Sequence, residues 1–378
     1  MTISSHQTHC FTTRVTMAAI AFIYLMTTCG GYAQEAIFWH HDFATARQQA
    51  VTQDRLLLIE FTSKHCPWCR EMEKETHPDQ AVIAAVQQDY VALRLEGNPD
   101  GIKQVYDVNG TPRTLILEPR TQTLLQRIKG FKRPGVYISE LADARDRLQL
   151  FQQSPDAFSH LQAADTAMRK RHWEEAIAQT TAALADAPDS RAVRNQRGYV
   201  LTILGRHAEA LADFDAAIET GEPDATLRFE HSLALYGLGR YAEAAEGFCR
   251  AAEMRRGNAS YEAVHAWCAM IADDGLVAAQ TYLDQHLRNH RYDRSESWSW
   301  RMVKYAAGKI DEEQLLNYSK RSYQKLQAQR LMGMRAWALD GPNAASTYFE
   351  AALNTDAQHI YDYSCVAADY ARLISGDE

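Results

Sequence analysis

The sequence predicts an α/β domain followed by a second domain that is entirely helical. The chain has 378 residues, more than one hydrophobic core usually serves, so two domains are expected. Residues 36–150 alternate short apolar runs, typical of buried strands, with stretches of helical spacing. Beyond that region, small and aromatic residues recur with a period of 34. We therefore place the domains at residues 36–150 and 157–378.

The composition is that of a folded protein. Hydrophobic residues make up 46% of the chain and charged residues 23%, so both domains can bury a core. The formal net charge of -8 argues against a nucleic-acid partner, because proteins that bind nucleic acid normally carry a basic face.

The first residues have the pattern of a secretory signal peptide. Arg14 precedes an apolar run over residues 15–26, which gives way to small and polar residues. Gly31 and Ala33 place small residues where a signal peptidase reads them, so residues 1–33 are predicted to be removed and the protein is expected in the periplasm. Two alternatives stay open: an uncleaved anchor helix, and a lipid anchor at Cys29, although Thr28 is a poor residue before a lipidated cysteine.

The elements of the first domain follow from its hydrophobic pattern. Residues 56–61 (LLLIEF) form a continuous apolar run, as in a strand that is buried on both faces. A helix is predicted over residues 70–88, and further strands over residues 90–95, 114–117 and 123–128. An amphipathic helix over residues 135–150 closes the domain, and Ser154-Pro155 breaks the chain after it.

The second domain repeats itself. Five sets of residues share one register at a spacing of 34: Ala176, Ala210 and Ala244; Ala183, Ala217 and Ala251; Gly205 and Gly239; Phe214 and Phe248; and Trp173, His207 and Tyr241. This pattern resembles the tetratricopeptide (TPR) family, in which small residues lie where paired helices cross. The resemblance implies an all-α solenoid with a concave surface for a protein partner. The period decays after Asn258, and one more unit is expected around Gly333 and Phe349.

The motif Cys66-Pro67-Trp68-Cys69 follows the first apolar run directly and is predicted to open a helix. A cysteine at a helix N-terminus feels the positive end of the helix dipole, which can bring its pKa to ~3.5–7.5. Pro67 suits the first helical turn, where its missing N–H costs nothing. Cys69 lies one turn on, at a Cα distance of about 5–6 Å, which a disulfide can close. Cys66 is therefore expected to attack, within reach of other chains, and Cys69 to resolve the mixed disulfide.

Two features around this motif resemble the thioredoxin superfamily, over roughly residues 36–150. Thr111-Pro112, just before a predicted strand, is similar to the family's cis-proline loop, which implies a central mixed sheet and a docking site for an extended substrate segment. Glu60 stands where the family keeps a buried acid that assists deprotonation of the second cysteine, although Glu replaces the usual Asp. Trp68, beside the sulfur, is interpreted as a further substrate contact.

The resemblance implies an exported thiol-disulfide oxidoreductase that acts on protein clients. The dithiol is its own redox centre, so no metal or organic cofactor is expected. A membrane dithiol-disulfide exchanger would serve as the electron partner. The sequence leaves open whether client disulfides are reduced or introduced, because the residues between the cysteines tune the reduction potential.

Other interpretations of the two cysteines fit the sequence less well. Zinc binding with His65 or His77 lacks a further ligand pair, and haem attachment needs a histidine where Arg70 stands. A purely structural disulfide in so short a loop would give little stability. The leading alternative function is a non-catalytic scaffold, in which the TPR surface acts and the thioredoxin-like part is a docking module.

Three further cysteines, Cys249, Cys268 and Cys365, are expected to be buried as small apolar residues. A disulfide between Cys249 and Cys268 stays open, because they are predicted on neighbouring helices.

Overall fold

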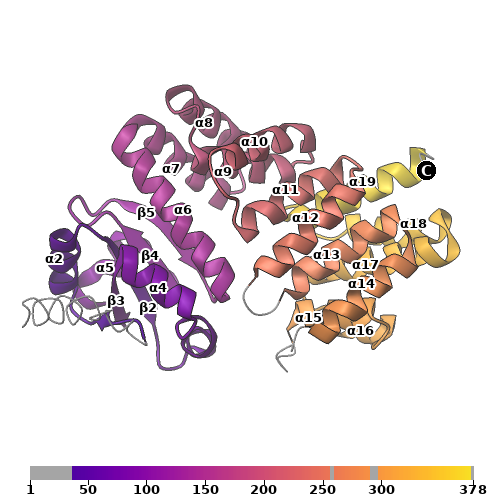
Figure 1. Ribbon diagram of the computed structural model, residues 1–378, viewed down its shortest axis with the longest axis horizontal. Coiled ribbons are helices and arrows are strands. Elements are labelled where there is room, and N and C mark those ends of the chain that lie inside the picture. Colours follow the sequence, from indigo (N-terminus) through magenta and orange to yellow (C-terminus); the bar gives the residue numbers. More distant parts are fainter. Residues whose placement is uncertain (1–35, 256–258, 290–296, 376–378) are drawn as a thin grey trace, which may run out of the picture.

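The computed structural model describes residues 36–255, 259–289 and 297–375 (Figure 1). The predicted signal peptide, residues 1–33, lies outside this part of the chain. No helix within the described ranges is long and apolar enough to cross a membrane.

A mixed sheet of five strands forms the centre of the first domain, in the order β1-β3-β2-β4-β5. Strands β1, β3 and β2 run parallel, whereas β4 is antiparallel to β2 and β5 to β4. Their bounds are β1 (Trp39–His40), β2 (Leu56–Thr62), β3 (Tyr90–Glu96), β4 (Arg113–Leu117) and β5 (Leu124–Lys129). The four predicted strands are present, and β2, which is buried along almost its whole length, lies at the centre as its apolar run predicted.

Helices cover this sheet on both faces, and one of them differs from the prediction (Figure 1). The helix predicted over residues 70–88 is wrong as a single element. It is broken at His77–Asp79, because Pro78 cannot continue a helix and the Asp79 side chain accepts from the N–H groups of Ala81 and Val82 to start a new one. The helices of this domain are α2 (Phe43–Gln53), α3 (Pro67–Glu71), the π-helical turn η1 (Met72–Thr76), α4 (Gln80–Asp89), the short 3₁₀ turn η2 (Pro99–Gly101), α5 (Ile102–Val105) and α6 (Pro134–Gln153).

Stacked helix pairs make up the rest of the described chain. The pairs are α7 (Pro155–Arg169) with α8 (Trp173–Asp186), α9 (Arg191–Ile203) with α10 (His207–Glu219), α11 (Ala225–Gly237) with α12 (Tyr241–Met254), α13 (Ser260–Asp273) with α14 (Leu276–Asn289), and α17 (Ser322–Asp340) with α18 (Pro342–Leu353). Helices α15 (Trp298–Ala306) and α16 (Glu312–Tyr318) precede the last pair, and α19 (Tyr361–Ser375) follows it.

The recurring residues hold each pair together. The periodic alanines are fully buried, and Gly198 lies so close to the next helix that an added Cβ would be 2.6 Å from the ring of Phe214. Gly205 and Gly239 adopt positive φ angles of 74° and 77° in the turns, where other residues would be strained. The predicted period therefore corresponds to the packing of the solenoid.

Two other helices pack on the face of the solenoid formed by α7, α9, α11 and α13, here called the first-helix face. Helix α6 contacts α7, α9 and α11, and α19 contacts α9 and α11. Tyr361 of α19 lies edge-on to Tyr199, with ring centroids 5.9 Å apart, and Asp369 accepts a 2.8 Å hydrogen bond from Tyr236. Helices α6 and α19 of the same chain therefore cover part of the surface that the sequence predicted to bind a protein partner.

The buried core continues from one domain into the other. Leu58 of β2 belongs to the same apolar cluster as Leu141 and Leu150 of α6, and as Phe158 and Leu161 of α7. Helix α6 ends one residue before the Ser154-Pro155 break, but the boundary itself stays a prediction because buried side chains meet across it.

Candidate active site

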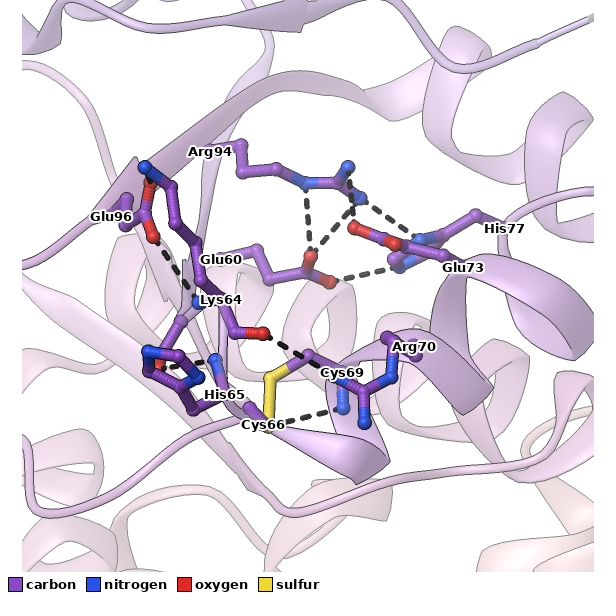
Figure 2. Close-up of a disulfide and its surroundings, with 11 residues drawn as sticks. Glu60, Lys64, His65, Cys66, Cys69, Arg70, Glu73, His77, Arg94 and Glu96 are labelled. Atoms are coloured by element: carbon purple, nitrogen blue, oxygen red, sulfur yellow. Dashed lines mark hydrogen bonds and ion pairs between the residues drawn. A yellow bond between two sulfur atoms is a disulfide. The ribbon is translucent and has the colours of Figure 1, made fainter.

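Cys66 ends the turn that follows β2 and caps α3. Its N–H donates to the carbonyl of Ser63 at 3.0 Å, and its extended backbone (φ -90°, ψ 105°) hands the chain to Pro67, the first helical residue. The Sγ of Cys66 accepts a 3.1 Å hydrogen bond from the N–H of Cys69. The two cysteines form a disulfide with a Cα separation of 5.3 Å (Figure 2). The predicted pair therefore lies where a helix terminus can stabilise a thiolate.

The sulfur pair is less exposed than the sequence suggested. Cys66 is 6% exposed and Cys69 3%, although the neighbouring Pro67 lies at the surface. Trp68 is 59% exposed and stacks on Phe131, with ring centroids 5.8 Å apart and an interplanar angle of 26°. Phe131, in the loop between β5 and α6, was not singled out from the sequence. Together these two rings form an apolar rim next to the segment from Ser63 to Cys69, here called the dithiol turn.

The loop at Thr111 and Pro112 lies beside the same end of the sheet. Their peptide bond is cis, as the resemblance implied. Pro112 immediately precedes β4, whose first residue, Arg113, pairs with Phe61 near the end of β2. Since β2 continues into the dithiol turn, the sheet register brings this loop and Cys66 to one edge. Pro112 is buried and its carbonyl accepts from the N–H of Gly130 at 3.0 Å, while Thr111 is half-buried.

Glu60 is bound by two basic side chains that the sequence did not reveal. It is 2% exposed on β2 and lies in register with Arg94 on β3. Arg94 Nε donates to Glu60 Oε1 at 3.1 Å, and its Nη1 donates to Glu73 at 3.3 Å. His77 Nε2 lies 2.8 Å from Glu60 Oε2. Figure 2 shows the Glu60 carboxylate turned toward Arg94 and His77, and we call these four residues the Glu60 network.

The Glu60 network determines the tautomer of His77. Arg94 Nη2 approaches His77 Nδ1 at 3.0 Å, and because a guanidinium can only donate, Nδ1 accepts. The imidazole proton then lies on Nε2, the nitrogen nearest to Glu60. His77, which the sequence offered only as an alternative zinc ligand, is thus engaged away from the cysteines. A charged residue inside the apolar strand YVALRLE was the one signal that could have identified Arg94.

The other thiols in the described part of the chain are free; Cys268 and Cys365 are buried as predicted, whereas Cys249 is only partly buried. Burial raises the pKa of Cys249 to about 11, and it raises those of Cys268 and Cys365 to about 12, so their thiols stay protonated and unreactive. The alternative disulfide between Cys249 and Cys268 is not formed. No three His, Cys, Asp or Glu side chains within the described ranges are grouped to hold a metal ion.

Comparison with protein families agrees with this arrangement. Residues 38–119 match a thioredoxin-like family, and residues 161–225 and 204–263 match tetratricopeptide repeats. The chain therefore carries a thioredoxin-like domain with a Cys66–Cys69 pair, followed by TPR repeats, as the sequence predicted.

Several solved structures are similar to parts of the chain. A thioredoxin from Thermus thermophilus is 23% identical and covers 29% of this chain and 88% of its own, with a TM-score of 0.27. The C-terminal domain of DsbD from Neisseria meningitidis, in the oxidised form, is 18% identical over 27% of this chain and 95% of its own, with a TM-score of 0.24. A tetratricopeptide repeat protein from Parabacteroides merdae is 15% identical over 62% of this chain and 94% of its own, with a TM-score of 0.39. No curated protein matches the chain.

Proposed function

We propose that this protein is a thiol-disulfide oxidoreductase that exchanges disulfides with protein clients through Cys66 and Cys69. The observation that carries the proposal is the position of the Cys66 sulfur, which caps α3 and accepts the N–H of Cys69 while bonded to its partner sulfur. A thiolate in that position gains a hydrogen bond and the favourable end of the helix dipole. It is therefore both a better leaving group and an ionised nucleophile.

The exchange proceeds in two balanced steps. When a client is reduced, the Cys66 thiolate attacks one client sulfur, and the other client sulfur leaves as a thiolate. Cys69 then loses its proton and attacks Cys66, which closes the disulfide and releases the second client thiolate. Two electrons pass to the client, and the reverse sequence introduces a disulfide.

We assign supporting roles to the residues around the dithiol. Glu60 accepts the proton of Cys69, and Arg94 and His77 hold its carboxylate in place. Trp68, largely exposed and stacked on Phe131, gives the client an apolar contact. The backbone of Thr111 and Pro112, at the neighbouring strand end, aligns the client segment. No metal or organic cofactor takes part.

The same proposal covers location and partners. Residues 1–33 direct export to the periplasm, and a membrane dithiol-disulfide exchanger restores the redox state of the dithiol. The TPR repeats bind a protein partner. Because α6 and α19 cover part of the first-helix face, that partner meets only the remainder of this surface.

Trapping of mixed disulfides tests the proposal. In a Cys69→Ala variant the first step can occur but the second cannot, so clients should stay attached to Cys66. We expect adducts that dithiothreitol releases, seen on non-reducing gels after expression in the native compartment. The matched control is Cys66→Ser/Cys69→Ala, which keeps Cys249, Cys268 and Cys365. The same adducts from both variants, or none from a folded and abundant Cys69→Ala protein, would rule out exchange through Cys66.

The near burial of Cys66 favours a second candidate, the non-catalytic scaffold. Disulfide exchange needs an attacking sulfur to approach along the S–S axis, and only 6% of Cys66 is exposed. A Cys66→Ser variant separates the candidates in cells. If Cys66→Ser abolishes the activity of the protein in cells, the enzyme hypothesis is supported. If the activity is unchanged, the protein is a scaffold in which the thioredoxin-like domain only docks.

A further inference from the structure

A cavity of about 520 Å³ lies between α6 and the first-helix face, apart from the Glu60 network and the cysteines. Its walls come from α6, α7, α9 and α11, which can be followed in Figure 1. Seven carboxylates and four arginines line it, so its surface is acidic. The volume is that of a typical small-molecule site.

The arginines of this cavity already have partners. Arg147 donates to Asp143 at 2.8 Å and to Asp165 at 2.7 Å. Arg191 donates to the carbonyl of Glu222 at 3.0 Å. Of the other two, Arg127 donates to the carbonyls of Tyr106 and Asp107, and Arg145 pairs with Asp89. Each of the four guanidinium groups is therefore already engaged within the fold, although Arg127 Nε has no partner.

Glu230, by contrast, has no partner. It projects from α11, is only 9% exposed, and makes no hydrogen bond or ion pair with any described residue. Burial, together with the nearby carboxylate of Asp224, raises the pKa of Glu230 to about 8 against the opposing effect of Arg255. A buried carboxyl group of this kind normally has a bound counterpart.

Four more buried polar atoms around the cavity lack hydrogen-bond partners in the described part of the chain. They are Arg127 Nε on β5, Asn195 Oδ1 and Gln196 Nε2 on α9, and Thr226 Oγ1 on α11. Unsatisfied buried atoms are uncommon in proteins, and these gather at one cavity together with Glu230. Two of the four, the amide oxygen of Asn195 and the hydroxyl oxygen of Thr226, can accept a hydrogen bond.

We propose that this cavity binds a ligand through an ammonium or guanidinium group, which pairs with Glu230 and donates to Asn195 and Thr226. A cation with several N–H donors fits this wall, because Glu230 and the unpartnered oxygens of Asn195 and Thr226 are acceptors on the neighbouring helices α9 and α11. Two sources carry that group: a free amine such as a polyamine, or a lysine or arginine side chain of a bound protein segment. The site is separate from the dithiol and does not rest on the proposed redox function.

Isothermal titration calorimetry of the purified full chain in its disulfide form tests the proposal. The probes are agmatine, spermidine and a blocked pentapeptide with one central arginine. At pH 9, above the pKa of Glu230, we expect at least one to bind, and Glu230→Gln to weaken that binding by at least about tenfold, because it removes the charge of the acceptor. The matched control is Glu219→Gln on the exposed surface of α10, which should bind as the wild type does.

The outcomes of the titrations distinguish the possible occupants of the cavity. Binding of a free amine identifies a small-molecule site, whereas binding of the peptide alone identifies a basic side chain as the occupant. No binding of any probe at millimolar concentration, or equal binding by Glu230→Gln, overturns the proposal and leaves a cavity filled by water. If Glu230→Gln does not fold, Asn195→Ala serves in its place, with an expected loss of about threefold. Client trapping by Cys66 is measured separately, so either proposal can fail alone.

Discussion

Glu60 and Arg94 lie opposite each other on the two adjacent strands β2 and β3, and the guanidinium Nε donates to the carboxylate at 3.1 Å. Glu60 is almost fully buried, so this is an ion pair inside the sheet rather than on its surface. Because β2 leads directly into the dithiol turn, this ion pair lies on the strand that positions Cys66.

Arg94→Leu should destabilise the domain strongly. Removing the cation leaves a buried carboxylate without its guanidinium partner and with only His77 beside it, and the loss of one partner of a buried pair typically costs about 3–5 kcal/mol. Urea denaturation of the two proteins measures the change in the free energy of unfolding. The matched control is Arg240→Leu, which breaks an exposed pair with Glu243 and should cost at most about 1 kcal/mol. Equal losses in both variants would mean that water screens Glu60.

Glu230 should make stability depend on pH. Burial raises its pKa in the folded protein to about 8, from an ordinary value of 4.5, so the folded state holds this proton more tightly than the unfolded state. The contribution to stability is complete below about pH 4.5 and is lost as pH rises through about 8. The stability of the wild type relative to Glu230→Gln should therefore fall between pH 5 and pH 9 in urea unfolding. A constant difference would show that Glu230 is already charged and paired.

Alkylation should separate the cysteines by reactivity. At pH 8 a thiol with a pKa of about 12 is ionised in only about one molecule in ten thousand, so Cys268 and Cys365 should not react with iodoacetamide in the folded, reduced protein. Cys66 should be modified first, and peptide mass spectrometry gives the order. Both buried cysteines should react after unfolding in guanidinium. Early modification of Cys268 or Cys365 would show that the solenoid opens readily.

Gly198→Ala should destabilise the repeat domain. The new methyl group would lie 2.6 Å from the Phe214 ring, and overpacking of this kind typically costs about 1–3 kcal/mol. Thermal unfolding followed by circular dichroism measures the loss. Gly221→Ala is the matched control, because its Cβ would meet only the flexible end of Arg191, at 3.2 Å. If both variants unfold at the same temperature, α9 and α10 can move apart without loss of stability.

The sequence predicted the elements that local pattern controls. Strand β2 is a continuous apolar run, and the solenoid repeats its alanines at a fixed spacing, so each carries its signal in neighbouring residues. Helix α2 was missed because it buries only Ala46 and Ala50, which gives a weak amphipathic pattern. Strand β1 was missed because two residues cannot show a period, and its pairing with Ala92 and Leu93 is distant in sequence.

The candidate site likewise has parts that the sequence predicted and parts that it did not. The cysteine pair and the cis peptide bond at Pro112 follow from short motifs. The partners of Glu60 do not, because Arg94 and His77 reach it through strand register and through the helix break at Pro78. The packing of α19 on the first-helix face likewise depends on contacts such as that between Tyr236 and Asp369, 133 residues apart.

The apolar cluster shared by β2, α6 and α7 has a consequence for any attempt to cut the protein in two. A fragment that stopped at residue 150 would leave Leu141 and Leu150 without the cover of Phe158 and Leu161, and so would present bare hydrocarbon to water. The two halves are therefore expected to melt in a single cooperative transition. The Cys66–Cys69 disulfide is therefore held at a fixed position relative to the repeats and does not move on a flexible linker.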